Sequence, residues 1–181
     1  MASTITTTSP AALAPDWPVD LYAVLRNHRI TQFGYVPDAG HKVLIELALA
    51  DPEVHAIPLT TEEEGVGVIA GADLGGARAV LLLQSSGVGN CVNFLSLVKA
   101  ARFPMLLVVS MRGDFGEGNP WQYPMGQAVE PALHAMGVVT LRADRADDVV
   151  PMANAAADMV YQGGQAVGLL LTQRLIGAKQ F

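Results

Sequence analysis

The sequence has few charged residues and only one cysteine. Asp, Glu, Lys and Arg account for 15% of its 181 residues, whereas an average soluble domain has about 25%. The formal net charge is −6 and the lysines and arginines are not clustered, so the chain lacks the basic patch typical of nucleic-acid binding proteins. The lone Cys91 excludes an internal disulfide and cannot hold a metal ion by itself. We expect it to be a small buried apolar side chain rather than a reactive thiol.

Long hydrophobic runs are also missing. The apolar runs 79–83 and 105–109 are far shorter than the roughly 20 residues that a membrane-spanning helix needs. Residues 1–16, rich in Ser, Thr, Pro and Ala, lack the basic start and apolar stretch of a signal peptide. We therefore expect a disordered leader over 1–16 and one cytoplasmic domain over 17–181. Hydrophobic residues nonetheless reach 51%, which together with the low charge favours a large interface with a partner chain.

Short apolar segments alternate with amphipathic ones from residue 17 onward, and no β-hairpin signal appears. Strands are expected over 30–36, 54–59, 79–84, 105–110, 138–141 and 167–171. Helices are expected over 19–27, 41–50, 90–101, 126–136 and 147–161, with a further helix that begins after Thr61. This alternation predicts an α/β fold, a six-stranded parallel sheet with helices on both faces.

The loops that follow the strands are the most distinctive parts of the chain. They cover 37–40, 60–62, 84–90 and 110–124. In open parallel sheets, ligands bind beyond the carboxyl ends of the strands. We therefore expect these loops to converge on one site.

Three consecutive glutamates open a helix that has very few large side chains. Thr61 and Glu64 fit a capping box, in which a hydroxyl and a carboxylate satisfy free N–H groups at the helix start. Each glycine in the helix interior costs about 1 kcal/mol relative to alanine, so we infer that another group approaches this backbone closely. Glu62 lies on the same helix face as Gly65 and Ile69, which makes it the candidate functional carboxylate. The favourable helix dipole is sufficient to explain Glu63 and Glu64.

Four segments carry a resemblance to a known family. They read YVPDAG at 35–40, TEEEGVGVIAGADL at 61–74, QSSGVGNCVNFLSL at 84–97, and SMRGDFGEG with PMGQA within 110–128. Together they resemble the pyrimidine-binding domain of thiamin-diphosphate-dependent decarboxylases. The likeness is strongest to the α subunits of sulfopyruvate decarboxylase and to the matching region of phosphonopyruvate decarboxylase, and it runs in order from about residue 19 to residue 171.

The resemblance implies thiamin diphosphate as cofactor and assigns it contacts. In the family, one glutamate hydrogen-bonds N1′ of the aminopyrimidine, and a glycine follows it nine positions later. Glu62 fits this register, whereas Glu63 and Glu64 do not. The family's loop that corresponds to 84–93 lies along the pyrimidine edge. This makes cofactor contacts of Gln84, Gly87, Gly89, Asn90 and Asn93, although a plain strand-to-helix turn is an alternative for the two glycines.

Three further side chains are implied to face the substrate. Asp38 is a candidate catalytic residue for proton handling, with an Asx turn after proline as the alternative. Arg112 suits an acid that carries a sulfonate or phosphonate, and its alternative is an ion pair with Asp114 or Glu117. His41 is a second substrate-binding candidate, and its alternative is a solvent-facing helix residue.

Two features depart from the family. Thr61 stands where many members have a histidine before the catalytic glutamate. The chain also lacks the GDG motif and downstream asparagine with which the family's second domain holds Mg²⁺ and the diphosphate, because RGDFG is not GDG. The resemblance therefore implies half an active site without a metal site of its own. A diphosphate-binding β subunit that carries GDG and the asparagine would supply the other half.

The function implied is that of the α subunit of a heteromeric 2-oxo acid decarboxylase, active only with its partner. The leading reaction converts sulfopyruvate, a small anionic 2-oxo acid, to sulfoacetaldehyde and CO2. Phosphonopyruvate decarboxylation and a thiamin-diphosphate carboligase are alternatives. A non-catalytic nucleotide- or ligand-binding module on the same fold is an alternative of another class. A nucleotide-binding dehydrogenase domain is disfavoured, because the GxGxxG fingerprint is incomplete.

Overall fold

The sheet has six strands, all parallel. The structure is a computed structural model that describes residues 16–178, so the expected leader lies, except for Asp16, outside the described residues. The strand order is β2-β1-β3-β4-β6-β5, and every neighbouring pair is parallel. The strands are β1 (Ile30–Tyr35), β2 (His55–Pro58), β3 (Arg78–Gln84), β4 (Met105–Ser110), β5 (Val139–Ala143) and β6 (Ala166–Leu171). The predicted α/β fold with a six-stranded parallel sheet is confirmed.

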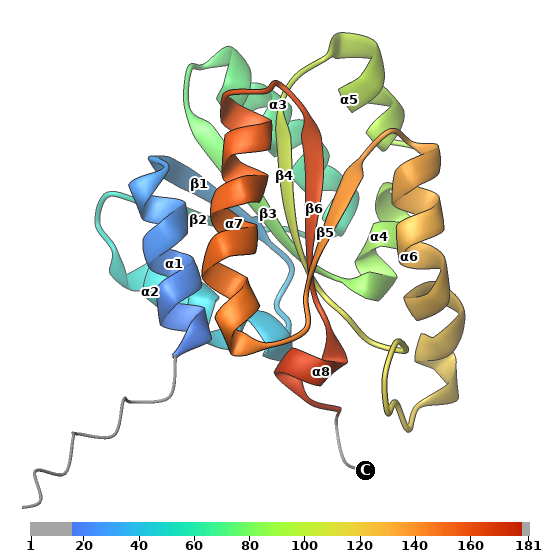
Figure 1. The fold of residues 1–181 in the computed structure, drawn as a ribbon. Coiled ribbons are helices and arrows are strands. Elements are labelled where there is room, and N and C mark those ends of the chain that lie inside the picture. The colour runs from blue at the N-terminus through green and yellow to red at the C-terminus, as the bar shows by residue number, and fades with distance from the viewer. Residues whose placement is uncertain (1–15, 179–181) are drawn as a thin grey trace, which may run out of the picture.

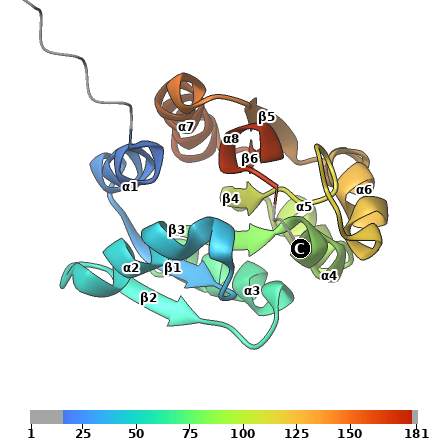
Figure 2. The same cartoon turned by 90° about the horizontal axis from the view of Figure 1, so that it is seen from below.

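Helices cover both faces of the sheet (Figures 1 and 2). One face packs against α1 (Trp17–Asn27), α2 (Lys42–Ala50) and α7 (Ala146–Tyr161). The other packs against α3 (Glu62–Leu74), α4 (Ser85–Cys91), α5 (Leu95–Ala101) and α6 (Tyr123–Ala135). The described part of the chain also contains two short 3-10 turns, η1 (Ala39–His41) and η2 (Pro120–Gln122), and the short helix α8 (Gln173–Ile176).

The continuous apolar strands serve two cores at once. Val80 and Leu82 of β3 belong to the core under α1, α2 and α7. Their neighbours Leu81 and Leu83 belong to the core under α3 to α6. Since successive side chains of a strand point to opposite faces, a strand covered on both sides must be apolar throughout. No helix within residues 16–178 combines the length and apolarity needed to cross a membrane.

The segment after β3 differs from the prediction. In place of a loop over 84–90 and one helix over 90–101, α4 begins directly at Ser85, a turn over 92–94 follows, and α5 begins at Leu95. Two glycines lie inside α4 despite their low helix propensity. Close packing against neighbouring side chains explains them, as described below. The helix expected over 126–136 also begins earlier, at Tyr123.

The start of α3 is only partly as predicted. The Thr61 side chain makes no capping hydrogen bond, and its Oγ1 is buried without a partner. The carboxylate of Glu64 instead accepts a hydrogen bond from the backbone N–H of Thr60, at 2.7 Å. The capping box predicted between Thr61 and Glu64 is therefore wrong. Glu64 still accepts a backbone hydrogen bond, but the donor is Thr60, the residue before the N-cap, instead of Thr61.

The close approach predicted for the glycine-rich helix is found at one end only. A Cβ on Gly65 would lie 2.8 Å from Cδ2 of Leu81, and nearer still to Cδ1. The sheet itself therefore requires a glycine here. At Gly71, a Cβ would meet nothing within 4 Å, so packing within the described chain does not require a glycine at that position.

Candidate functional site

The loops after three adjacent strands meet at the carboxyl edge of the sheet, the end that faces the viewer in Figure 2. Asp38 follows β1, while Gln84 and Ser110 are the last residues of β3 and β4. Asp38 Oδ1 accepts a hydrogen bond from Gln84 Nε2 at 2.9 Å. Its Oδ2 accepts one from the Ser110 hydroxyl at 2.6 Å and one from the backbone N–H of Gly40 at 2.8 Å. The convergence predicted from the topology is thus observed for these three loops.

The surroundings of Asp38 keep its carboxylate ionised. Burial raises the pKa of Asp38, but the hydrogen bonds from Ser110 and Gln84 outweigh it, so the pKa lies below its usual value. The nearby His41 and the N–H of Gly40 lower the pKa further. The hydrogen bond from the Gly40 N–H to Asp38 closes an Asx turn, the alternative given for Asp38 from the sequence. At neutral pH Asp38 is a fixed hydrogen-bond acceptor, which suits anchoring better than proton transfer.

Glu62 is the one buried member of the glutamate triplet. It is 9% exposed, whereas Glu63 and Glu64 are exposed. Its Oε2 accepts a hydrogen bond from Asn90 Nδ2 at 2.7 Å. A Cβ on Gly87 would lie 2.5 Å from both Cδ and Oε1 of Glu62. The carboxylate therefore occupies the space that any side chain at position 87 would need, and α3 and α4 meet at this point.

The structure brings together only some of the predicted cofactor-binding residues. Glu62, Gly87 and Asn90 form one contact group, in which the Asn90 amide is directed at Glu62. Gln84 belongs to the Asp38 group. Gly89 faces Met125, with an added Cβ 3.1 Å from its Sδ.

Asn93 is exposed on the turn between α4 and α5. Ser86 and Ser110 are further polar residues at this edge that the sequence pattern does not single out. The Ser86 hydroxyl donates to Gln84 Oε1 at 2.9 Å, and the Ser110 hydroxyl donates to Asp38. The only available signal was that each is polar at or just after the end of an apolar strand.

Arg112 forms the ion pair that was its alternative assignment. Its Nε lies 2.5 Å from Oε2 of Glu117 and its Nη2 lies 2.9 Å from Oε1, so the pair is bidentate and buried. The hydrogen bond from Arg112 outweighs burial and lowers the pKa of Glu117 to about 2. Glu117 also accepts hydrogen bonds from the Gln173 side chain and from the backbone N–H of Asn119. The loop after β4 is thereby tied to α8.

His41 lies inside the protein. It is fully buried, with Nε2 3.1 Å from the carbonyl oxygen of Leu83. Burial lowers its pKa, although the charge of Asp38 opposes this shift. The imidazole is therefore neutral at physiological pH. The solvent-facing alternative is wrong, and a direct substrate contact would require the buried ring to become accessible.

A pocket of 160 Å³ opens between the Asp38 group and the end of α8. Asp38, Ser110 and Arg112 line one side, and Ile176, Gly177 and Ala178 line the other. It adjoins two of the predicted substrate-facing residues, Asp38 and Arg112. Asp38 also lines a pocket of 390 Å³ on the side of α2, which Arg112 does not reach.

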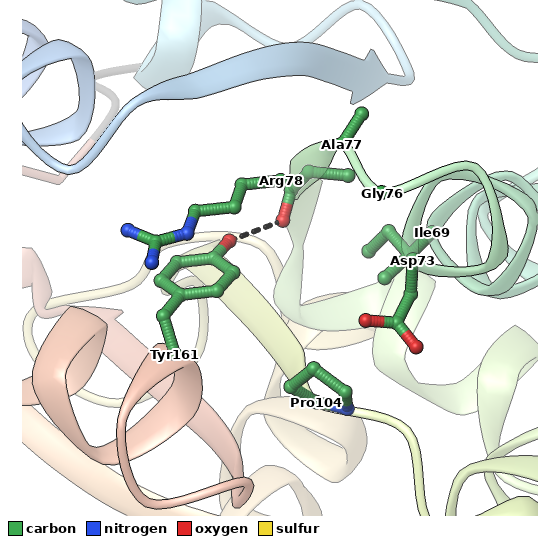
Figure 3. A pocket seen from close by; sticks show the side chains of 8 residues that line it. Ile69, Asp73, Gly76, Ala77, Arg78, Pro104 and Tyr161 are labelled. Atoms are coloured by element: carbon green, nitrogen blue, oxygen red, sulfur yellow. Dashed lines mark hydrogen bonds between the residues drawn. The ribbon is translucent and has the colours of Figure 1, made fainter.

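Another pocket, of 190 Å³, lies at the opposite end of the sheet, where β3 and β4 begin (Figure 3). Two of its polar side chains, those of Tyr161 and Arg78, are already paired. Tyr161 donates to the carbonyl of Ala79 at 2.7 Å, and Arg78 lies over the Tyr161 ring and donates to the carbonyl of His28. Asp73 is the exposed carboxylate of this pocket. We therefore place the candidate site at the carboxyl edge.

Cys91 is buried, and the described residues hold no cluster of metal ligands. Cys91 is 1% exposed, and burial, aided by Glu62 and Glu63, raises the pKa of its thiol to about 12. The prediction of a buried cysteine is confirmed, and the raised pKa agrees with a thiol that stays protonated at neutral pH. Across residues 16–178, no group of three or more His, Cys, Asp or Glu side chains is arranged to hold a metal ion.

The fold of the chain is similar to that of part of a larger enzyme of known structure. The 2-oxoglutarate:ferredoxin oxidoreductase from Magnetococcus marinus, solved with 2-oxoglutarate, coenzyme A and succinyl-CoA bound, superposes with a TM-score of 0.72. The match covers 91% of this chain and 29% of that one, at 15% identity. At this identity the likeness shows the fold alone.

Sequence relatives identify the family, although no protein-family model matches the chain. Sulfopyruvate decarboxylase subunit alpha of Methanocaldococcus jannaschii is 35% identical over 151 residues, which cover 83% of this chain and 89% of the relative. The subunit of the same name from Methanothermobacter thermautotrophicus is 38% identical over 119 residues, 65% of this chain and 72% of the relative. Phosphonopyruvate decarboxylase of Streptomyces viridochromogenes is 35% identical over 67% of this chain, but the match covers 28% of that protein. The chain therefore belongs to the family of sulfopyruvate decarboxylase α subunits.

Proposed function

We propose that the chain is the α subunit of a heteromeric, thiamin-diphosphate-dependent decarboxylase that converts sulfopyruvate to sulfoacetaldehyde and CO2. The observation that carries the proposal is the setting of Glu62. One carboxylate of three is buried, and it is oriented by Asn90 and given space by Gly87. The names of the relatives support the substrate.

The residues around Glu62 fit the aminopyrimidine of thiamin diphosphate. Asn90 occupies Oε2, and no hydrogen bond from within residues 16–178 engages Oε1. Oε1 would hold N1′, because a carboxylate oxygen can share a proton with a ring nitrogen. When bound, the cofactor supplies the carbon nucleophile and the electron sink that decarboxylation of a 2-oxo acid requires.

The chain's own residues keep this carboxylate ready for that role. Glu62 is the first residue of α3, where the positive end of the helix dipole stabilises its negative charge. Asn90 fixes the plane of the carboxylate by donating to one oxygen. The low exposure of Glu62 restricts water, which strengthens the hydrogen bond that Oε1 would make.

The remainder of the site is assigned to a β subunit. We propose that this partner carries the GDG motif and the asparagine, and that it holds Mg²⁺ and the diphosphate. The word alpha in the names of the relatives implies a second subunit. An exposed aromatic side chain close to the site agrees with a partner surface. Trp121 is 82% exposed and lines an apolar pocket together with Met125. Met125 in turn packs against Gly89 of α4.

The 160 Å³ pocket is our proposed substrate end of the site, with Arg112 as a contact for an anionic group. Asp38 lines the same pocket, and Glu117 already neutralises Arg112. The charges of these three residues sum to a net negative value, so further positive groups for a doubly anionic acid would come from the partner. Phosphonopyruvate is the second candidate substrate, supported by the Streptomyces viridochromogenes relative.

The test is reconstitution with a β subunit that carries GDG and the downstream asparagine, in the presence of thiamin diphosphate and Mg²⁺. CO2 release is followed from sulfopyruvate and from phosphonopyruvate. We expect Glu62→Gln to lower kcat by about 10²–10⁴-fold, the usual range for a lost acid–base group. The matched control, Glu63→Gln, alters the exposed neighbour and should retain activity within about 2-fold. Equal losses in the two variants would contradict the assignment of Glu62.

A further inference from the structure

We propose that Asp38 is a positioning residue for Glu62, acting through Gln84 and Ser86 on the first turn of α4. The inference rests on the proposed role of Glu62. It assigns to Asp38 a task other than proton transfer to or from the substrate. Four observations carry it.

The first observation is that Asp38 is itself held firmly. It accepts hydrogen bonds from Gln84, Ser110 and Gly40, at 2.9, 2.6 and 2.8 Å. These donors belong to the ends of β3 and β4 and to the turn after β1. An ionised acceptor makes hydrogen bonds roughly twice as strong as a neutral one. Asp38 is thus a rigid reference point across three adjacent strands.

The second observation is that the charge of Asp38 sets the direction of the Gln84 amide. An ionised carboxylate can only accept hydrogen bonds, so the NH₂ group of Gln84 must face Asp38. The carbonyl Oε1 of Gln84 then faces Ser86, whose hydroxyl donates to it at 2.9 Å. The hydrogen bonds from Ser86 to Gln84 and from Gln84 to Asp38 therefore run in one direction.

The third observation is the position of Ser86 in α4. The hydrogen bond to Gln84 ties the first turn of this helix to the end of β3. The same turn is held from the other side by Ser85, whose Oγ accepts from the backbone N–H of Arg112 at 3.1 Å. The first turn of α4 is therefore fastened to the end of β3 and to the loop that follows β4.

The fourth observation is what this turn touches. Gly87, the next residue, lies against Cδ and Oε1 of Glu62. Asn90 comes four residues after Ser86, on the same side of the helix, and donates to Oε2 of Glu62. A shift of the α4 first turn would therefore move both groups that define the place of the carboxylate. A misplacement of about 1 Å can cost about 100-fold in rate.

The experiment is a double-mutant cycle on the reconstituted enzyme. Asp38→Asn removes the charge that orients Gln84, and Gln84→Met keeps the bulk of the side chain but removes both hydrogen bonds. We expect each to lower kcat by about 10–100-fold, with KM for the substrate changed less than 3-fold. If Asp38 acts through Gln84, the double variant loses no more than the stronger single variant. Losses that multiply would show that Asp38 acts by a route other than Gln84 and would overturn the inference.

A second measurement uses the full α chain without cofactor. Hydrogen exchange at the backbone amides of α4 should be faster in Asp38→Asn and Gln84→Met than in the wild type. The matched control is Tyr161→Phe, which removes a hydrogen bond of 2.7 Å at the opposite end of β3 (Figure 3) and should leave exchange in α4 unchanged. Unchanged exchange in α4 of Asp38→Asn would refute the inference.

The two proposals fail separately. If Glu62→Gln keeps its activity, the proposed function is wrong, whatever the exchange of α4 shows. If Glu62→Gln is inactive while Asp38→Asn matches Tyr161→Phe in kcat, the function stands and only the positioning role of Asp38 is lost.

Discussion

Replacing Gly87 with alanine places a methyl group where the carboxylate of Glu62 lies. The new Cβ would be 2.5 Å from both Cδ and Oε1 of Glu62. Non-bonded carbon atoms are optimally separated by about 3.5–4.0 Å, so the carboxylate or α4 must move by about 1 Å. A displacement of this size is expected to lower kcat/KM about 100-fold, equivalent to about 2.7 kcal/mol in the activation barrier.

The same substitution should change stability much less than activity. Overpacking costs about 1–3 kcal/mol, but alanine is favoured over glycine inside a helix by about 1 kcal/mol, and Gly87 lies inside α4. The net loss of unfolding free energy is therefore about 0–2 kcal/mol. The variant should fold and assemble, so that the loss of activity can be measured on intact enzyme.

The assay compares kcat/KM of reconstituted Gly87→Ala with that of Gly89→Ala, and urea unfolding checks the fold of both. A Cβ on Gly89 would lie 3.1 Å from Sδ of Met125, a flexible side chain that can move aside. Gly89→Ala should therefore keep kcat/KM within about 3-fold of the wild type. If Gly87→Ala is equally active, contact between position 87 and Glu62 does not matter for catalysis, and the reasoning is refuted.

Three other substitutions test the packing of α3 and the buried ion pair. Gly65→Ala should lower the unfolding free energy by about 1–3 kcal/mol, because its Cβ would collide with Leu81. Gly71→Ala should raise the unfolding free energy by about 1 kcal/mol, because a Cβ there meets nothing within 4 Å. Urea titrations measure both changes. Glu117→Gln should cost about 3–5 kcal/mol at neutral pH, since it leaves Arg112 buried without its partner. The pKa of Glu117 is lowered from 4.5 to about 2, so the stability due to this carboxylate is complete above pH 4.5 and is lost as the pH falls from 4.5 to 2. Unfolding of Glu117→Gln should consequently depend less on pH across that window than unfolding of the wild type, and equal pH dependence would contradict the pairing.

The sheet and its site edge were predictable because they follow from strong, local signals. A strand buried on both faces must be apolar throughout, and the runs at 79–83 and 105–109 show this directly. Parallel topology then brings the ends of such strands together. Glu62 was selected by the spacing of its glycines, and its burial between Gly87 and Asn90 agrees with that choice.

The features that were missed depend on tertiary contacts. The segment SSGVG has the composition of a turn, yet it is helical. Its glycines are explained by the close approach of Glu62 and Met125 to α4. The spacing after Arg112 offered two acidic partners, and only the folded loop selects Glu117. For His41 the sequence left a substrate contact and a solvent-facing position open, but the residue ends the 3-10 turn η1 and lies fully buried.

Glu117 also affects what a second chain would encounter at this edge. Its carboxylate ties Arg112, Asn119 and Gln173 together, immediately before the segment that displays Trp121 to solvent. The loop that carries the indole is therefore already ordered by these hydrogen bonds before a partner binds. A binding partner that covers it gives up little chain entropy on docking, so more of the free energy of burying the aromatic ring remains as affinity.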